Sequence, residues 1–262
     1  MLFDNHSHTV FSSDSEMTAA DAIAQAESLG LGLVFTEHYD HIYKHTKHYD
    51  GTIDFRFDPS AYWDQYQQYR GDKLRLGVEI GLTPDSRDAN LAFLQQADFD
   101  LVIGSLHFME NLDLYYPDYY EGKDKAQAYG KYLSTMGQMI VENPYIDVLG
   151  HIDYICRYAP YEDKDIKYSD GAELIDKVLQ AVIDNGIVME LNTRRLEDAM
   201  AVTKLMQIYR RYQQLGGQYI TLGSDAHKAE NIGMNFKTAQ HMAECLKLKP
   251  VTFAERKMEY CK

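Results

Sequence analysis

Short apolar runs alternate with longer stretches of helical periodicity along most of the chain. Thr18 is suited to begin a helix and Gly30 to end it, because a hydroxyl caps the first amides and glycine tolerates a left-handed turn. In 123–141, apolar side chains recur every three or four residues, as on one face of an α-helix. The predicted strands are 2–5, 32–36, 74–81, 100–105, 147–150, 187–191 and 219–223, and the predicted helices are 19–29, 85–97, 123–141, 170–184, 197–215 and about 237–246.

This alternation predicts an α/β fold. Strands that alternate with helices form parallel sheets, and seven such units in one chain predict a closed or nearly closed barrel. The chain has no linker rich in proline, glycine or serine and no internal repeat, so we expect one domain over 1–262. Residues 251–262 give no clear assignment.

One segment, 39–62, does not fit the alternation. It is long and irregular and contains His41, His45 and His48. Loops of this length inside a compact domain are usually either functional or disordered. The pattern is compatible with a lid over the barrel mouth and with a loose insertion.

Composition and charge exclude several classes of protein. The 26 Lys and Arg residues against 40 Asp and Glu give a net charge of −14, which argues against an extended nucleic acid as a partner. No apolar run reaches the ~18 residues of a membrane span. The polar, acidic start shows no secretory signal, and three widely spaced cysteines exclude a disulfide framework. We therefore expect a cytoplasmic protein.

Polar side chains follow the predicted strands at the point where each strand ends. In a parallel barrel these ends meet on one rim, so residues far apart in sequence are expected to converge there. Six of the ten histidines fall at such ends. Any one of them has a simple explanation as a turn residue, but six together favour metal binding. The histidines are His6, His8, His38, His107, His151 and His227, with Glu79 and Asp225 among the carboxylates.

The spacing of these residues supports a metal site. In His6-Ser7-His8, alternate side chains of an extended segment point the same way, so both rings can reach one ion. Imidazole combined with carboxylate suits zinc, iron or manganese better than calcium or magnesium. No cysteine lies in these motifs, which argues against a structural zinc–thiolate site.

Taken together, the motifs resemble those of the polymerase and histidinol phosphatase (PHP) family. They are Asp4-Asn5-His6-Ser7-His8, Thr36-Glu37-His38, Gly77-Val78-Glu79, Ser105-Leu106-His107, Gly150-His151-Ile152-Asp153 and Gly223-Ser224-Asp225-Ala226-His227. The resemblance runs in order across nearly the whole chain. It implies a distorted (β/α)7 TIM-like barrel with three divalent metal ions at the C-terminal ends of the strands. Within the family, residues 150–157 and 190–194 are most similar to the monofunctional histidinol-phosphate phosphatases, which implies hydrolysis of L-histidinol phosphate in histidine biosynthesis.

The resemblance also implies a set of ligands. By its motifs, His6, His8, Glu79 and Asp225 would hold the first ion. Glu79 would bridge to a second ion, completed by His107 and His151, and Asp14, His38 and His227 would hold the third. Two adjacent dications can supply a bridging hydroxide at neutral pH that attacks phosphorus, so Glu79 and Asp225 are also predicted to be catalytic.

A phosphate monoester favours a forked cationic donor, which arginine provides. Arg157 and Arg194 come just after predicted strand ends and are the predicted phosphate clamp, with Arg195 as a competitor for the role of Arg194. The proton for the leaving alkoxide is assigned either to His41 or to a metal-bound water. Further predicted substrate contacts are Tyr115, Tyr116, Glu121, Asn192 and Arg195.

Three other functions are compatible with the sequence. The first is another PHP phosphoesterase that acts on a small phosphomonoester, a nucleotide or phosphotyrosine. The second is an amidohydrolase-like hydrolase, against which the Asp225-Ala226-His227 ending and Glu37-His38 count. The third is a non-catalytic metal-binding module. The expected partner in the leading interpretation is a small phosphorylated substrate, with no membrane and no extended nucleic acid.

Overall fold

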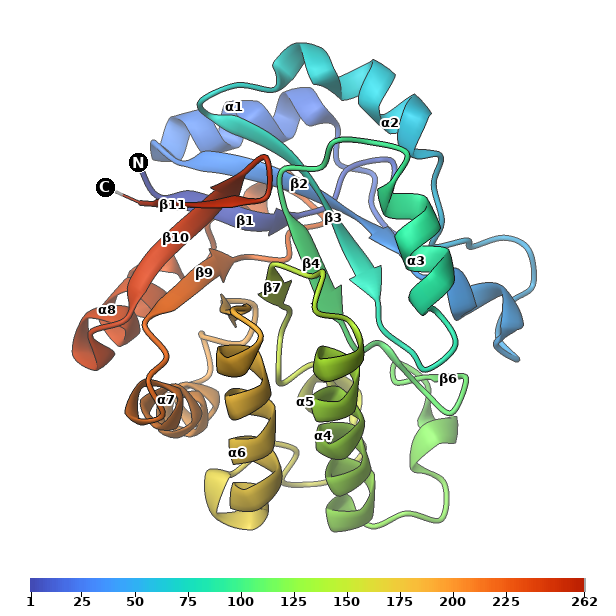
Figure 1. The fold of residues 1–262 in the computed structure, drawn as a ribbon, viewed down its shortest axis with the longest axis vertical. Helices are drawn as coiled ribbons and strands as arrows, with labels where there is room; N and C mark the ends of the chain where they lie inside the picture. Colours follow the sequence, from blue (N-terminus) through green and yellow to red (C-terminus); the bar gives the residue numbers. More distant parts are fainter. Residues whose placement is uncertain (262) are drawn as a thin grey trace.

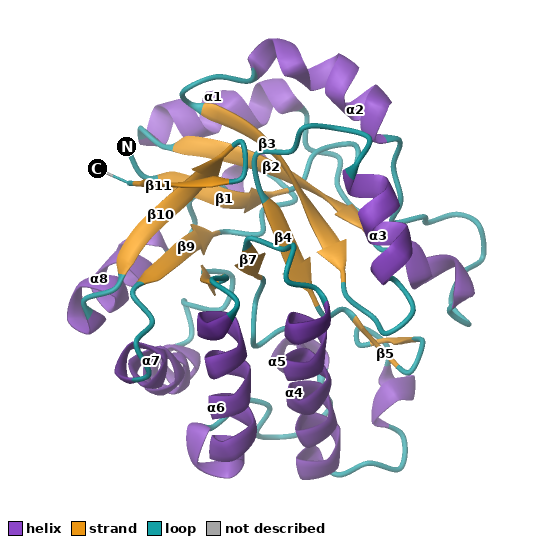
Figure 2. Ribbon diagram, in the orientation of Figure 1, coloured by secondary structure: helices purple, strands orange, loops and turns teal. Residues whose placement is uncertain are grey.

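The computed structural model describes residues 1–261, and its centre is a sheet of parallel strands wrapped by helices (Figure 1). The strands follow one another round the sheet in chain order, as β1 (Phe3–Ser7), β2 (Gly32–Tyr39), β3 (Leu74–Gly81), β4 (Val102–Ser105), β7 (Val148–Leu149), β8 (Val188–Asn192) and β9 (Tyr219–Gly223). The α-helices are α1 (Ala19–Leu29), α2 (Pro59–Tyr66), α3 (Arg87–Leu94), α4 (Lys125–Glu142), α5 (Ile155–Tyr158), α6 (Tyr168–Asp184), α7 (Ala199–Gln214) and α8 (Phe236–Leu246). Helices cover the outside of the sheet (Figure 2). No helix in residues 1–261 has the length and apolar character needed to cross a membrane.

The barrel is distorted where its first and last parallel strands meet. At their C-terminal ends, β1 and β9 are joined by a single bridge between Ser7 and Ala226. Towards the other end, β10 (Lys249–Ala254) pairs with the start of β9 and continues into an antiparallel pair with β11 (Lys257–Tyr260). The N-terminus lies beside this pair (Figure 1). Backbone hydrogen bonds therefore close the seam at the end where the predicted ligands lie, and the Asn5 side chain spans it further along by donating to the carbonyls of Leu222 and Val251.

The strands have an apolar interior at one end and a polar interior at the other. Alternate side chains of a strand point to opposite faces. On β3, Leu76 and Val78 belong to the core beneath the helices, whereas Glu79 faces inward. The apolar interior is formed by Phe3, Val34, Leu101, Ile103, Val148, Val188, Val251 and Phe253. The inward-facing polar residues lie beyond this apolar interior, at the C-terminal ends of the strands.

Several elements match the predicted bounds and others do not. The helix 19–29 and the strands 74–81 and 219–223 match. The Thr18 side chain accepts a hydrogen bond from the backbone amide of Asp21, as expected of a helix cap. Helix 85–97 is shorter, at Arg87–Leu94. Residues 251–262, left unassigned, contribute to β10 and β11 within the described part of the chain. The elements that the sequence did not predict are β5 (Phe108–Met109), β6 (Leu112–Asp113), α2, α5 and the 3-10 helices η1 (His41–His45), η2 (Gln67–Tyr69), η3 (Pro117–Tyr120) and η4 (Ala229–Asn231).

Candidate metal centre

Glu79 lies at the centre of a cluster of buried side chains at the C-terminal ends of the strands. Its carboxylate is fully buried. Oε1 lies 3.2 Å from Nε2 of His107 and 2.9 Å from Nε2 of His151. Oε2 lies 3.3 Å from Nε2 of His6 and 3.7 Å from Nε2 of His8. The two oxygens thus face different pairs of imidazoles, as a carboxylate that bridges two ions would.

Asp225 closes the side of the cluster next to β1. Its Oδ1 lies 3.3 Å from Nε2 of His8 and 3.8 Å from Nε2 of His6. The backbone of Asp225 has a φ of 55°, and its amide donates to the carbonyl of His6 at 2.8 Å. The bond across the seam therefore holds this carboxylate against the His-x-His pair.

His227, His38 and Asp14 form a third group at the outer edge. Oδ2 of Asp14 lies 3.1 Å from Nε2 of His227 and 3.6 Å from Nε2 of His38. His38 also points Nδ1 at Oε2 of Glu79, at 2.8 Å. The ring of His8 stacks on those of His38 and His227, with centroids 4.0 Å and 4.3 Å apart. The three predicted ligand groups therefore form one continuous cluster.

The residues present fit divalent metal ions. Nε2 of His6, His8 and His107 is buried, and in the described part of the chain none of these three nitrogens makes a hydrogen bond of suitable geometry. Each such atom costs roughly 1–3 kcal/mol if nothing binds it. Ligand atoms of a tetrahedral zinc ion lie about 3.3 Å apart, since zinc–nitrogen distances are about 2.0–2.1 Å. The separations of 2.9–3.8 Å around Glu79 and Asp225 have this scale.

Carboxylates and a hydroxyl outside the cluster orient its members. Nδ1 of His6 lies 2.6 Å from Oε1 of Glu190, and Nδ1 of His107 lies 3.2 Å from both oxygens of Asp40. Ser105 donates to Oε1 of Glu79 at 2.6 Å. Such partners fix the ring orientation of a ligating histidine and raise its basicity. Sequence reasoning assigned no role to Glu190 or Asp40, although Glu190 lies two residues before Asn192 and Asp40 two residues after His38.

Charges within the cluster shift the pKa values of its members in opposite directions. Burial alone would lower the pKa of His6, but the carboxylates of Glu190 and Glu79 raise it well above its usual range. Burial alone would raise the pKa of Glu79, but His6, His107 and His38 lower it well below its usual range. A metal cation that enters such a site displaces the protons from the imidazoles, and the ionised carboxylate of Glu79 then neutralises part of the charge of the cation.

The close approach of Asp40 to β3 depends on Gly81. A Cβ added at Gly81 would lie 1.8 Å from Oδ1 of Asp40. We expect Gly81→Ala to displace Asp40, release the ring of His107 and weaken metal binding by about tenfold or more. Metal retained after dialysis against graded chelator measures this effect. Gly130→Ala is the matched control, because its added methyl would meet Leu174 at an ordinary 3.8 Å. Equal metal retention by the two variants would contradict the role of Asp40.

The two predicted phosphate-binding arginines lie on the Asp225 side of the cluster but differ in their surroundings. Arg157 donates to Oδ2 of Asp225 at 2.6 Å and to Oδ1 of Asn192 at 3.1 Å, and its side chain is 7% exposed. Arg194 lies 3.7 Å from the same Asp225 oxygen, with a side chain that is 42% exposed. Arg157 is therefore occupied in holding Asp225, whereas Arg194 is free to turn towards a ligand.

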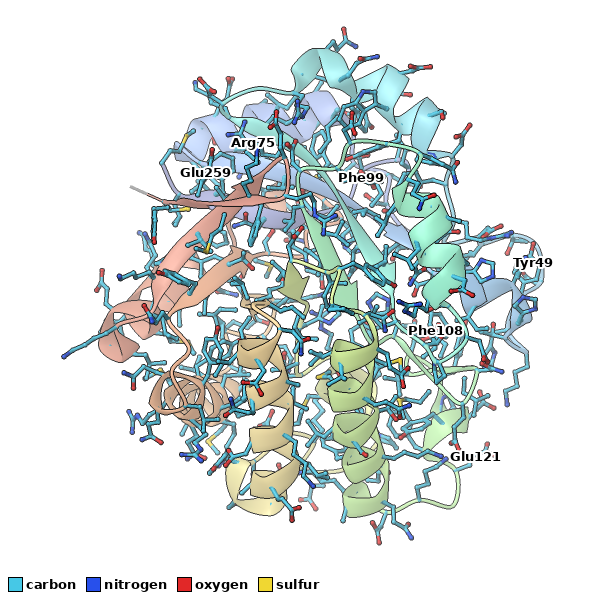
Figure 3. All side chains as sticks on the ribbon, viewed as in Figure 1. Tyr49, Arg75, Phe99, Phe108, Glu121 and Glu259 are labelled. Carbon is cyan, nitrogen blue, oxygen red and sulfur yellow. The ribbon has the colours of Figure 1, made fainter. Side chains whose placement is uncertain are left out.

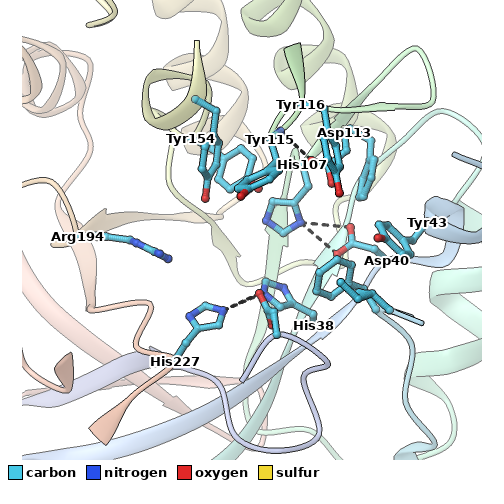
Figure 4. Close-up of a pocket in the computed structure, with 15 residues that line it drawn as sticks. His38, Asp40, Tyr43, His107, Asp113, Tyr115, Tyr116, Tyr154, Arg194 and His227 are labelled. Carbon is cyan, nitrogen blue, oxygen red and sulfur yellow. Dashed lines mark hydrogen bonds and ion pairs between the residues drawn. The ribbon is translucent and has the colours of Figure 1, made fainter. Parts of the chain in front are cut away.

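A cavity of about 430 Å³ opens beside the cluster. Asp14, His38, His107, His227 and Arg194 line it on one side. The other side is mostly aromatic and is contributed by the segment 39–62, by the residues after β4 and by residues 154–158 at α5 (Figure 4). The aromatic and apolar lining residues are Tyr43, Ile53, Phe55, Phe108, Tyr115, Tyr116, Tyr154 and Tyr158. Pockets of this size and lining suit small ligands.

Several predicted substrate-contacting or catalytic residues do not line this cavity. The ring of His41 lies beside that of His45, with centroids 6.3 Å apart. Arg195 forms ion pairs with Asp153, at 3.0 Å, and with Asp165. Glu121 is exposed at the end of η3, and Figure 3 shows it well away from Phe108, which lines the cavity. Tyr115 and Tyr116 do line the cavity, whereas Asn192 does not. Oδ1 of Asn192 accepts hydrogen bonds from the Arg157 side chain and from the backbone amide of Arg194, both at 3.1 Å.

Comparisons with known proteins agree with this geometry. The sequence pattern described as the PHP domain matches residues 4–194. A protein of Clostridium acetobutylicum named a probable histidinol-phosphatase is 43% identical over 260 residues, which cover 99% of this chain and 100% of that protein. The histidinol-phosphatase of Lactococcus lactis subsp. lactis is 29% identical, over 90% of this chain and 88% of its own. A crystal structure of the histidinol phosphate phosphatase from Lactococcus lactis subsp. lactis, complexed with zinc, L-histidinol and phosphate, matches with a TM-score of 0.90, 28% identity and coverage of 98% of both chains.

Proposed function

Because this chain belongs to the PHP domain family, we propose that it is a metal-dependent phosphatase that hydrolyses L-histidinol phosphate to L-histidinol and phosphate. One observation carries the proposal: an arginine, a cluster of histidines around Glu79 and an aromatic wall surround the same cavity. The similarity over almost the full length to a phosphatase solved with zinc, L-histidinol and phosphate supports it. A small phosphorylated partner and a cytoplasmic location belong to this proposal.

The ligand groups suggested by the motifs provide the sites for the metal ions. We assign His6, His8, Glu79 and Asp225 to one ion, Glu79, His107 and His151 to a second, and Asp14, His38 and His227 to a third. When bound, such ions lower the pKa of a water and neutralise charge on the phosphoryl oxygens. Zinc, iron and manganese all suit this donor set.

The chain's own residues position the substrate and keep the ligands in place. Arg194 is assigned to the phosphate, because its forked guanidinium reaches the cavity beside Asp225. Arg157 is assigned to positioning Asp225 and, through it, the His-x-His pair. Tyr43, Ile53 and Phe55 place the segment 39–62 along the cavity wall, which supports the proposed role of this segment as a cover. A role for His41 as proton donor stays a prediction.

We expect Arg194→Ala to lower kcat/KM for L-histidinol phosphate by about 100-fold, because a charged hydrogen bond to phosphate contributes roughly 1.5–3 kcal/mol. Metal content should stay at the wild-type value, since Arg194 contacts no imidazole of the cluster in the described residues. Steady-state kinetics and elemental analysis measure both. The neighbouring change Arg195→Ala breaks a largely buried ion pair and should lower the stability by about 3 kcal/mol with KM close to wild type. If Arg195→Ala raised KM instead, the phosphate-binding role would belong to Arg195 and not to Arg194.

The experiment that tests the function is phosphate release from a panel of substrates. Protein loaded with zinc, manganese or iron is given L-histidinol phosphate, a mononucleotide, phosphotyrosine and a lactone. The proposal expects the highest kcat/KM with L-histidinol phosphate. Preference for the nucleotide or phosphotyrosine would move the assignment to another PHP phosphoesterase. Release from no phosphoester, with metals confirmed bound, would favour a non-catalytic module.

A further inference from the structure

The aromatic side of the cavity contains two carboxylates, Asp40 and Asp113. Both oxygens of Asp40 face Nδ1 of His107. Asp113 is different, because only one of its oxygens has a partner in the described residues: Oδ1 accepts the amide of Tyr115 at 2.8 Å. Asp113 as a whole residue is only 7% exposed. A nearly buried carboxylate with one uncommitted oxygen is thus directed into a ligand-sized cavity.

The backbone fixes Asp113 in this place. The chain leaves His107, forms β5, turns at Glu110 and Asn111 and returns as β6, so that Phe108 pairs with Asp113. Both turn residues have positive φ values, 55° and 60°, as the two central residues of a tight hairpin turn require. The amide of Leu114 donates to the carbonyl of His107 at 3.0 Å. The hairpin therefore carries Asp113 back beside the strand end that presents a proposed ligand.

The walls around Asp113 suit a cation. Tyr43 packs against Phe55 and Phe108, with ring centroids 4.7 Å and 6.0 Å apart. Tyr116 is held from the other loop by the ring of His48, which stacks on it at 3.7 Å. Aromatic faces attract cations, and a carboxylate among them has little water to screen its charge. Burial raises the pKa of Asp113 to about 6, against the opposing effect of the Tyr115 amide.

The cavity has a positive side chain at one end and a negative side chain at the other. Figure 4 shows Arg194 and Asp113 on opposite sides of His107. Resting on the proposed function, we propose that Asp113 is a specificity-determining residue that accepts a hydrogen bond from a protonated nitrogen of the substrate, while the phosphate lies at the Arg194 end. The cavity then selects phosphomonoesters that carry a cation at the other end of the molecule and disfavours neutral ones.

The test compares two substrates in one protein, so that the ratio is independent of how much of a variant is folded. L-Histidinol phosphate carries the cation, and p-nitrophenyl phosphate does not. Asp113→Asn keeps the size of the side chain and the acceptor for the Tyr115 amide. We expect its kcat/KM for L-histidinol phosphate to fall about 10- to 100-fold while that for p-nitrophenyl phosphate stays within about twofold. Inhibition of p-nitrophenyl phosphate hydrolysis by L-histidinol should weaken by a similar factor.

Two further substrates identify which nitrogen is recognised. O-Phosphoethanolamine has an ammonium without the ring, and 3-(imidazol-4-yl)propyl phosphate has the ring without the ammonium. The substrate whose kcat/KM falls in Asp113→Asn carries the recognised nitrogen. Glu110→Gln is the matched control, because it removes an exposed carboxylate from the turn of the same hairpin.

An equal fall with L-histidinol phosphate and p-nitrophenyl phosphate would overturn the inference, since Asp113 would then act through the metal cluster. No fall with either substrate would overturn it as well. Failure of the proposed function has a different signature, namely wild-type protein that releases no phosphate from L-histidinol phosphate. In that case the ratio for O-phosphoethanolamine against p-nitrophenyl phosphate still reports on Asp113.

Discussion

Glu79→Gln is expected to abolish phosphate release and to lower the metal content of the purified protein. The substitution keeps the shape of the side chain and removes the negative charge between two pairs of imidazoles. The carboxylate is fully buried, and the neighbouring imidazoles of His6, His107 and His38 hold its pKa well below the usual range, so it offers a negative charge to a cation at neutral pH. We expect kcat to fall on the order of 10³-fold.

Elemental analysis and single-turnover phosphate release measure this loss. Asp100→Asn is a control matched for burial, because Asp100 is also fully buried but lies at the opposite end of β4, where it accepts from Arg70 at 2.6 Å. That variant should lose stability and keep its metals and its kcat. Wild-type turnover with a full complement of metal in Glu79→Gln would refute the bridging role.

Removal of the metals is the second change with a large expected effect. Treatment with a strong chelator should leave a protein without activity and with a lower melting temperature. A ligand at 100 times its Kd stabilises a fold by about 2.7 kcal/mol, which corresponds to roughly 5–10 °C per site for a chain of this size. The reason in this structure is the set of buried imidazole nitrogens that are left without partners.

Differential scanning fluorimetry before chelation, after chelation and after addition of zinc, manganese or iron measures the effect. Recovery of both the melting temperature and phosphate release with at least one ion is the expected result. The same treatment of Glu79→Gln should change its melting temperature much less. Full activity in protein that elemental analysis finds free of metal would contradict the proposed mechanism.

The ligands could be predicted from the sequence because of one geometric rule. The C-terminal ends of parallel strands meet at one rim, so His6, Glu79 and Asp225 could be placed together before any coordinates were considered. The strand Leu74–Gly81 and the helix Ala19–Leu29 could also be predicted from the sequence, since the alternation of apolar runs with helical stretches and the helix caps are local signals. These residues converge in the structure as expected, and their ligation of metal stays a prediction.

Other features depend on contacts that no local pattern encodes. The orienting roles of Asp40 and Glu190 depend on which nitrogen of a ring faces inward. Asp113 lies on a strand of two residues that exists only because its hairpin pairs beside His107. In 39–62, by contrast, a signal was present and was missed: Asp58 before Pro59 is a helix start, and the Asp58 side chain accepts the amide of Ser60.

The seam of the barrel has a consequence for how the protein is made. During synthesis, His6 and His8 leave the ribosome among the first residues of the chain, whereas Asp225 and His227 follow only near its end. The bridge from Ser7 to Ala226 cannot form before then. Ions bound across this junction would link the earliest and latest parts of the chain. We therefore expect complete loading with metal only after the C-terminal part of the chain has been made, and a chain truncated before Asp225 should have no complete site.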